Sequence, residues 1–410
     1  MVETPSPPAL AGVRVLDLSR VLAGPWASQL LGDLGAEIIK IEKPGAGDDT
    51  RGWGPPFLKN ADGETTDAAY FLAANRNKKS VAIDIAAPDG AALVRKIAAG
   101  SHILVENFKV GGLKKYGLDF ETLSRINPRL VYCSITGFGQ SGPYASRAGY
   151  DYMIQAMGGL MSVTGQPDGA AGAAPMKVGV AVADLFAGMY AATSILAALR
   201  HTERTGEGQH LDVALLDCQI AMLANQASNF LISGAAPRRL GNAHPNIAPY
   251  QVFETKDGHI VIAVGNDGQF SSFAKTIGAA ALVDDDRYIT NRARVANRET
   301  LTAAISTKMR ARTTAEWLGL MEAASVPAGA INSIDAVFSD PHVAARSMTA
   351  AINRPDAGGR RMVVHPVKYS RTPALDDGAP PSLGAHTDEV LSEFAGAGER
   401  AALKARGVIG

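Results

Sequence analysis

Cysteine is almost absent from this chain of 410 residues, which contains only Cys133 and Cys218. Both lie in apolar stretches, and two such residues cannot build the disulfide framework that is typical of small secreted proteins. We therefore expect two reduced, structural thiols and a cytoplasmic location.

Net charge and long apolar runs are also lacking. Lys and Arg together number 40, as do Asp and Glu, so the net charge is 40 − 40 = 0. Such a chain has no global field to attract nucleic acid or a membrane surface, and an anionic ligand would need a local basic cluster. The acidic, proline-rich residues 1–10 do not resemble a signal peptide, and no uninterrupted apolar run approaches about 18 residues. We expect no nucleic-acid partner and no membrane.

Several catalytic signatures are missing from the sequence. These are the Rossmann glycine spacing, the GK[ST] ending of a P-loop, HExxH, a paired CxxC and GxSxG. The eight histidines are scattered without ligand spacing, so we expect no metal site. His244 lies in a loop between expected elements, where it would hold loop structure or face solvent rather than bind a metal.

The composition is that of a packed α/β enzyme, with 46% apolar and 20% charged residues. Short β-branched or apolar runs alternate with helical patterns along the first third of the chain. This alternation with short connections predicts a parallel sheet covered by helices. The expected strands are residues 13–19, 36–42, 80–85, 102–108 and 129–136, and the expected helices are residues 25–35, 88–100 and 120–127.

The middle and the end of the chain follow other patterns. Two helical stretches rich in small residues cover residues 150–163 and 183–201, and a short strand at residues 210–215 leads into a long helix at residues 215–232. A hairpin at residues 250–265 and helices through about residue 325 predict a second, smaller domain. The tail carries a short helix near residues 340–346, a strand at residues 362–370 and a final helical stretch.

Three features could bind or transform a ligand. Gly24 and Pro25 open a helix whose free N–H groups could receive an anion, although a tight turn of a strand–helix–strand unit would need the same residues. Asp184 lies just inside a helix start, where an ionised carboxylate is favoured, but an ordinary capping aspartate is the simpler interpretation of that position alone. Basic residues cluster before residue 120, several of them after strand ends, where open α/β sheets bind ligands: Arg20, Lys40, Lys43, Arg51, Arg76, Lys78, Lys79, Lys109, Lys114 and Lys115.

Seven segments, in order along nearly the whole chain, resemble the class III CoA-transferase family, also called CaiB/BaiF. Each segment alone is a weak signal, whereas the ordered set is specific. The matching segments are residues 16–53, 75–85, 105–119, 127–165, 183–191, 204–217 and 241–253.

The resemblance implies that Asp184 is the catalytic carboxylate of a CoA-transferase. In the family this aspartate attacks an acyl-CoA to form an acyl-aspartyl anhydride, and the freed thiolate then converts the anhydride into an aspartyl-CoA thioester. A carboxylic acid acceptor repeats the exchange. A covalent carrier conserves the thioester energy as long as water is kept out. Coenzyme A and acyl-CoA are then substrates, and no tightly bound cofactor is implied.

The resemblance also implies the CoA-binding positions. Lys43 and Lys115 would face phosphates, and Ile83 would wall the adenine. Tyr150 and Asp151 would lie beside the thioester. Ala86 stands where some members carry a basic residue. The remaining CoA-binding positions are Val21, Leu22, Ala23, Asn107 and Phe108.

The local sequence favours one activity of the family over others. Racemases of 2-methylacyl-CoA use a second acid/base group, typically a histidine in AGHD, whereas this chain has AGYD with Tyr150. Formyl-CoA:oxalate transferases carry a glycine run where this chain has GNAHPNIAPY, in which His244 and Asn246 could contact an acceptor carboxylate. We therefore expect succinyl-CoA or a similar dicarboxylyl-CoA as donor. A CoA-binding protein without catalysis and a generic nucleotide-dependent α/β enzyme are further alternatives.

The family architecture implies an α/β fold: a Rossmann-like large domain with a parallel sheet and a smaller α+β domain. Ring-shaped subunits would interlock into a homodimer. On this basis residues 1–215 form the N-terminal part of the large CoA-binding domain and residues 216–240 a linker helix. Residues 241–325 form the small domain, and residues 326–410 return to complete the large domain.

Overall fold

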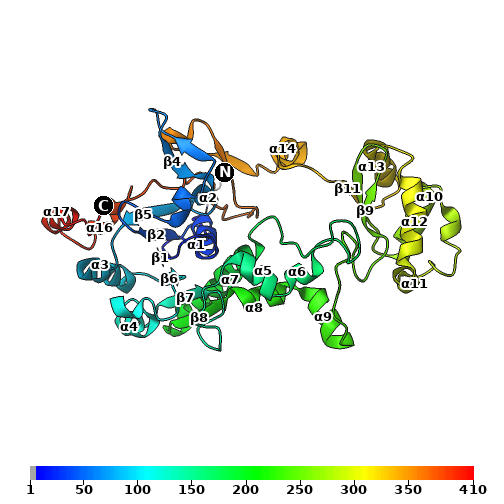
Figure 1. Cartoon of the computed structure of the whole chain (residues 1–410). Helices are drawn as coiled ribbons and strands as arrows, with labels where there is room; N and C mark the ends of the chain where they lie inside the picture. The colour runs from blue at the N-terminus through cyan, green and yellow to red at the C-terminus, as the bar shows by residue number, and fades with distance from the viewer. Residues whose placement is uncertain (1–5) are drawn as a thin grey trace. The chain divides into compact units, whose positions relative to one another are not determined.

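The computed structural model describes residues 6–410, and these residues divide into two compact units (Figure 1). The first unit contains residues 6–158, 179–222 and 344–410, and the second contains residues 159–178 and 223–343. The signal-peptide expectation for residues 1–10 falls partly on residues 1–5, which lie outside the described residues.

The first unit is built on a six-stranded parallel sheet with the order β5-β2-β1-β6-β7-β8. Counted along the chain, these strands have the spatial order 3-2-1-4-5-6 of a doubly wound dinucleotide-binding sheet. The predicted parallel sheet is thereby confirmed, and its topological switch point lies between β1 and β6. The strands are β1 Arg14–Asp17, β2 Glu37–Glu42, β5 Lys78–Ala82, β6 Ile103–Glu106, β7 Val131–Thr136 and β8 Gln209–Ala214.

Both faces of this sheet are covered, because successive apolar side chains of each strand point to opposite sides. Val15 packs on one side with helices α1 and α7, and the next residue, Leu16, packs on the other side with α3 and the C-terminal helices. Figure 1 shows the last helices of the chain beside β5, so both chain ends build this unit. The covering helices are α1 Ala23–Asp33, α3 Pro88–Ala99, α4 Phe120–Ile126, α5 Asp151–Met157, α7 Val182–Thr205, α8 Leu215–Met222, α16 Thr387–Leu391 and α17 Ala397–Ala405.

Smaller elements complete the first unit. A hairpin of β3 and β4, a hairpin of β12 and β13 and the short helix α2 enclose a separate apolar cluster around Phe71 and Met362. Their bounds are β3 Phe57–Lys59, β4 Thr65–Ala68, α2 Ala69–Ala73, β12 Thr349–Ala351 and β13 Arg361–Val363.

The second unit is an α+β unit with a three-stranded antiparallel sheet of order β11-β10-β9. Its core contains Phe253 and Ile260 from the sheet and Phe273, Ile305 and Trp317 from the helices. The elements are α6 Leu160–Val163, α9 Ala224–Ser233, β9 Tyr250–Glu254, β10 His259–Ala263, α10 Asp267–Thr276, α11 Asn291–Ala296, α12 Arg298–Met309, α13 Thr314–Ala323, β11 Ala328–Ala330 and α14 Ile334–Ser339. Helix α15 Pro341–Ala345 follows at the boundary between the units.

Three predicted elements differ from the structure for local reasons. The helix expected at residues 215–232 is two helices, α8 and α9, because Ala224 has a left-handed φ of 45°. The helix expected at residues 150–163 is interrupted at Gly159, where φ is 83°. The strand expected at residues 362–370 ends at Val363, before Pro366, which has no N–H to donate to a ladder.

Helix α7 is the one described helix whose length and hydropathy would suit a membrane span. Its buried side, including Ala187, Ala191, Ile195 and Leu199, belongs to the core that covers the sheet. A buried core helix of this kind passes the same length and hydropathy criteria as a membrane span.

Candidate active site

A pocket of about 660 Å³ lies at the carboxyl ends of β1, β6 and β7. Its wall is formed by Arg20–Ala23 after β1, residues 107–112 after β6 and residues 135–137 at the end of β7, and Asp184 of α7 also lines it. Open α/β sheets bind ligands at this edge, beside the switch point of the strand order. We call it the Asp184 pocket.

Asp184 occupies the third position of helix α7 and is half-buried. Ala181, and not Asp184, is the N-cap residue, so Asp184 is not the ordinary capping aspartate that its position alone suggested. Within residues 6–410 no hydrogen bond or ion pair engages its carboxylate. Burial and then the negative charge of Asp151 raise the pKa of Asp184 to about 7. An unpaired carboxylate of raised basicity in a pocket wall is suited to nucleophilic attack.

Asp151 is not among the residues that line the Asp184 pocket, and its side chain binds the start of α7. Its Oδ1 accepts the N–H of Ala183 at 2.8 Å, so it caps α7, and its Oδ2 accepts from Gln155 at 2.7 Å. The preceding Tyr150 does line the pocket and is 65% exposed. Asp151 therefore holds the helix that carries Asp184 and raises the pKa of that residue, while Tyr150 is available to a ligand.

The turn between β1 and α1 supplies the predicted residues Val21 and Leu22, and Ala23 is the first residue of α1; all three line the Asp184 pocket. The residue that follows Ala23 is Gly24, and its lack of a side chain allows the turn to be tight. A Cβ on Gly24 would come within 2.3 Å of the Ser19 Cβ. The glycine that the sequence associated with a helix start is thus required by the close approach of α1 to the end of β1.

Asn107 and Phe108 also line the pocket, and the Asn107 amide is engaged by the protein itself. Its Oδ1 accepts the Arg20 N–H at 2.9 Å, and its Nδ2 donates to the Arg20 carbonyl at 2.6 Å. The Arg20 guanidinium lies over the Phe108 ring, 5.4 Å from its centre. These contacts join the loops that follow β1 and β6 into one wall.

A second pocket of about 450 Å³, the Lys43 pocket, adjoins the first. The two share Arg20, Asp49, Phe108 and Tyr116, so together they form a long site for an extended ligand. Lys43, Ile83 and Ala86 line the second pocket, whereas Lys115 lines the first, with its ammonium 4.7 Å from the centre of the Tyr116 ring.

His244 and Asn246 belong to the second unit, and their side chains are engaged within it. The His244 Nδ1 accepts the Asn246 N–H at 3.1 Å, and the Asn246 Oδ1 accepts from Asn225 and Asn229. Burial and then the charge of Arg298 lower the pKa of His244. Their contact with an acceptor stays a prediction.

Three residues of the site were not singled out as site residues from the sequence. Lys109 and Arg147 line the Asp184 pocket. The guanidinium carbon of Arg147 lies over the Tyr144 ring, 3.9 Å from its centre, and Arg147 forms no ion pair among the residues that the structure describes. Tyr70 of α2 lies close enough to Asp184 for that charge, after burial, to raise the tyrosine pKa. Lys109 was visible in the basic cluster, but no spacing signal links Tyr70 or Arg147 to Asp184.

Neither cysteine lines the Asp184 pocket or the Lys43 pocket. Cys133 and Cys218 are buried and free, and burial raises the pKa of both thiols, that of Cys218 to about 11. Among residues 6–410 no group of three or more His, Cys, Asp or Glu side chains is arranged to hold a metal ion.

Comparison with known proteins identifies the family. The model of CoA-transferase family III matches residues 10–387. A succinate–glutarate CoA-transferase from Agrobacterium fabrum is 52% identical over 94% of this chain and 96% of its own length. A succinyl-CoA:glutarate CoA-transferase from Homo sapiens is 43% identical over 94% of this chain and 85% of its own length.

A solved structure agrees with these matches. The crystal structure of a CAIB/BAIF family protein from Brucella suis superimposes with a TM-score of 0.83 at 47% identity, covering 95% of this chain and all of that one. The family predicted from the ordered segments is thereby confirmed. With its carboxylate pocket at the switch point of a doubly wound sheet, the chain belongs to CoA-transferase family III and is a CoA-transferase.

Proposed function

We propose that the enzyme transfers CoA from succinyl-CoA to glutarate or a closely similar dicarboxylate, with Asp184 as the covalent carrier. The observation that carries this proposal is the unpaired Asp184 carboxylate in the wall of a pocket of about 660 Å³ that adjoins the Lys43 pocket. The relatives named for succinate and glutarate support the choice of substrates.

CoA is transferred first from succinate to Asp184 and then from Asp184 to glutarate. Neither transfer takes up or releases a net proton or electron. The Asp184 carboxylate attacks the succinyl-CoA carbonyl, and the C–S bond breaks to give a succinyl-aspartyl anhydride and CoA thiolate. The thiolate attacks the aspartyl carbonyl, which releases succinate and leaves an aspartyl-CoA thioester. A glutarate carboxylate attacks this thioester and expels the thiolate, which leaves a glutaryl-aspartyl anhydride. The thiolate then attacks the glutaryl carbonyl, and the anhydride C–O bond breaks to release the Asp184 carboxylate. The products are glutaryl-CoA and free Asp184.

The groups around Asp184 favour this chemistry over racemisation. No histidine lines the Asp184 pocket in the described chain, whereas proton removal and return at C2 would need an acid/base pair. Positive charge for the anionic ester comes from four basic residues that line the pocket: Arg20, Lys109, Lys115 and Arg147. We propose that His244 and Asn246 of the second unit contact the acceptor carboxylate.

The assembly that we propose is a homodimer of interlocked, ring-shaped subunits. Helices α5, α7 and α8 pack together and leave a row of large apolar side chains exposed on the first unit. An apolar surface of this kind is typical of an interface. The row consists of Tyr152, Met153, Met157, Phe186, Met189, Tyr190 and Ile220.

The cell location and the absence of a resident cofactor are also proposals. The two free, buried thiols support a reducing, cytoplasmic setting. The absence of a resident cofactor is tested by purifying the protein and analysing any retained small molecule by ultraviolet absorption and mass spectrometry. We expect coenzyme A or its esters and nothing else.

The activity is tested by incubating the protein with succinyl-CoA and a panel of dicarboxylates, and by trapping the intermediate with hydroxylamine. We expect glutaryl-CoA formation and a hydroxamate on Asp184. Asp184→Ala should abolish transfer and retain CoA binding. The matched control is Asp89→Ala on α3, which pairs with Arg406 and lines neither pocket. Undiminished transfer by Asp184→Ala would refute the proposed carrier.

A further inference from the structure

We infer that the buried ion pair of Lys40 and Asp48 is a positioning device, which holds the turn Ser19–Leu22 in the conformation that receives the CoA ester. Both side chains are fully buried, and the Lys40 Nζ lies 2.9 Å from the Asp48 carboxylate. The inference rests on the proposed binding of CoA in the Asp184 pocket and adds to it the residues that shape the pocket wall.

The turn contains a strained residue. Val21 has a φ of 71°, in the left-handed region that β-branched residues rarely adopt. Its neighbour Leu22 is the N-cap of α1, and both residues line the Asp184 pocket. A strained conformation persists only where the surroundings enforce it, and such residues concentrate at functional sites. Some other group must therefore hold Val21.

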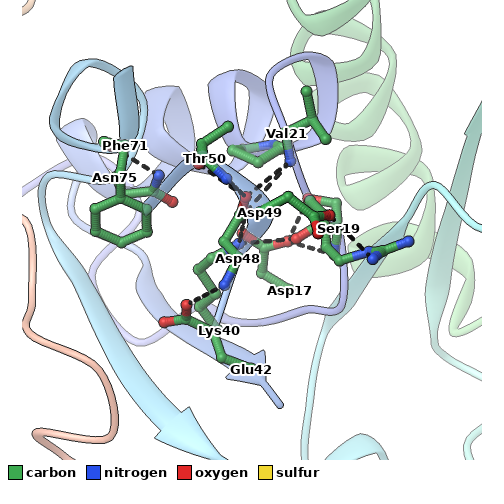
Figure 2. A network of polar contacts seen from close by, with 12 residues as sticks. Asp17, Ser19, Val21, Lys40, Glu42, Asp48, Asp49, Thr50, Phe71 and Asn75 are labelled. Atoms are coloured by element: carbon green, nitrogen blue, oxygen red, sulfur yellow. Dashed lines mark hydrogen bonds and ion pairs between the residues drawn. The ribbon is translucent and has the colours of Figure 1, made fainter. Parts of the chain in front are cut away.

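Asp48 is that group. Its two carboxylate oxygens lie 3.2 and 3.3 Å from the Val21 nitrogen and accept its N–H (Figure 2). Thr50 fixes the same carboxylate with its main-chain N–H at 3.0 Å and its hydroxyl at 2.8 Å. Burial alone would raise the pKa of Asp48, but the Lys40 charge and these hydrogen bonds lower it to about 2. The acceptor of the Val21 N–H is thus a carboxylate that is ionised at neutral pH.

Lys40 holds the other end of the turn. Its Nζ donates to the Ser19 carbonyl at 2.8 Å and to Asp48 at 2.9 Å. The parallel register of β1 and β2 places Lys40 opposite Asp17, at the point where β1 ends, so its side chain reaches the turn directly. Figure 2 shows Lys40, Asp48, Ser19 and Val21 converging in this way. One buried ion pair therefore fixes the turn on both sides of Arg20.

The far side of the turn is held as well, since Asn107 binds both main-chain groups of Arg20. With Asp48 in place, the wall is preorganised before the ester arrives, which lowers the cost of binding. Without it, Val21 can relax to a negative φ, and the wall loses its shape. The loss should appear in affinity for CoA, because Asp184 is carried by a different element, α7.

The test is a double-mutant cycle of Asp48→Ala and Val21→Gly, read as the dissociation constant of CoA by calorimetry and as the KM and kcat of transfer. Glycine adopts a positive φ without strain, so the variant with Val21→Gly no longer needs the carboxylate. We expect Asp48→Ala to raise the dissociation constant and KM about tenfold in the wild-type background, and less than about threefold when Val21→Gly is also present. The kcat should change little.

Asp33→Ala is the matched control, because Asp33 is fully buried, forms an ion pair with the almost fully buried Arg76 and lines neither pocket. It should lower thermal stability and leave CoA affinity unchanged. If Asp48→Ala does not fold, Asp48→Asn with and without Val21→Gly gives the same comparison. Equal effects of the Asp48 change in both backgrounds, or no effect on affinity, would overturn the inference. Failure of the wild-type protein to bind CoA would instead overturn the proposed binding site.

Discussion

Asp184 should cost the protein stability, and Asp184→Asn should recover it. The fold raises the pKa of this carboxyl from 3.8 to about 7, because burial and the charge of Asp151 disfavour the ionised form. Asparagine has nearly the same shape and no charge. The substitution should therefore abolish transfer and stabilise the folded protein.

The magnitude follows from the pKa difference. A rise from 3.8 to about 7 corresponds to about 4 kcal/mol as an upper limit. Asp184 is only half-buried and reaches water through the pocket, so we expect a gain of about 1–2 kcal/mol at pH 8. For the first unit this is a rise in Tm of roughly 2–8 °C.

The gain must depend on pH with a defined sign. A carboxyl whose folded pKa is raised contributes favourably below its unfolded pKa, and this contribution is lost as the pH rises through the folded pKa. The advantage of Asp184→Asn should therefore be full above about pH 7 and absent below about pH 4. Thermal unfolding of both proteins between pH 4.5 and pH 8.5 measures this difference. Asp89→Asn, an exposed surface aspartate, should show no comparable gain. A gain independent of pH, or no gain at pH 8, would refute the reasoning.

Four further predictions concern residues of the first unit. The kcat/KM for succinyl-CoA should rise as the pH passes about 7, because the proposed carrier Asp184 must be ionised to attack the ester; a flat profile from pH 6 to pH 8 would contradict this. Asp151→Asn retains an acceptor for the start of α7 but removes the nearby charge, so it should move that profile to lower pH. Burial raises the pKa of Glu106 to about 7, so denaturant unfolding should show Glu106→Gln to be stabilising above pH 7 and progressively less so down to pH 5. A Cβ on Gly137 would come within 2.5 Å of the Gly149 Cα in the pocket wall, so Gly137→Ala should weaken CoA binding at least tenfold by calorimetry, and unchanged affinity would exclude the close approach.

The parallel sheet was predictable because its signal is local. Buried strands such as β6 and β7 are short, mainly apolar runs between helical patterns, and this pattern can be recognised without knowledge of the partner strands. Breaks inside helices were not predictable in the same way. Ala224 is a strong helix former, and nothing in its neighbourhood of the sequence indicates the left-handed conformation that separates α8 from α9.

The candidate site also contains features that local sequence predicts and features that depend on contacts between distant segments. Asp184 could be proposed from its helix start together with the ordered family segments, and the turn at Gly24 from its glycine and proline. The roles of Asp151 and Asn107 could not, because capping α7 and binding the Arg20 main chain are contacts across 32 and 87 residues of sequence. The same holds for Tyr70 beside Asp184.

The sequence by itself therefore determined the family, the parallel α/β pattern and the family position of Asp184, the residue proposed as the carrier, since these depend on residue type and order along the chain. Only the tertiary structure decided that Asp184 is unpaired with a raised pKa, and that Lys40 and Asp48 hold Val21 in a left-handed conformation. The physical reason is that burial, electrostatic coupling and strand register arise between segments that are distant in sequence, and no local pattern encodes them.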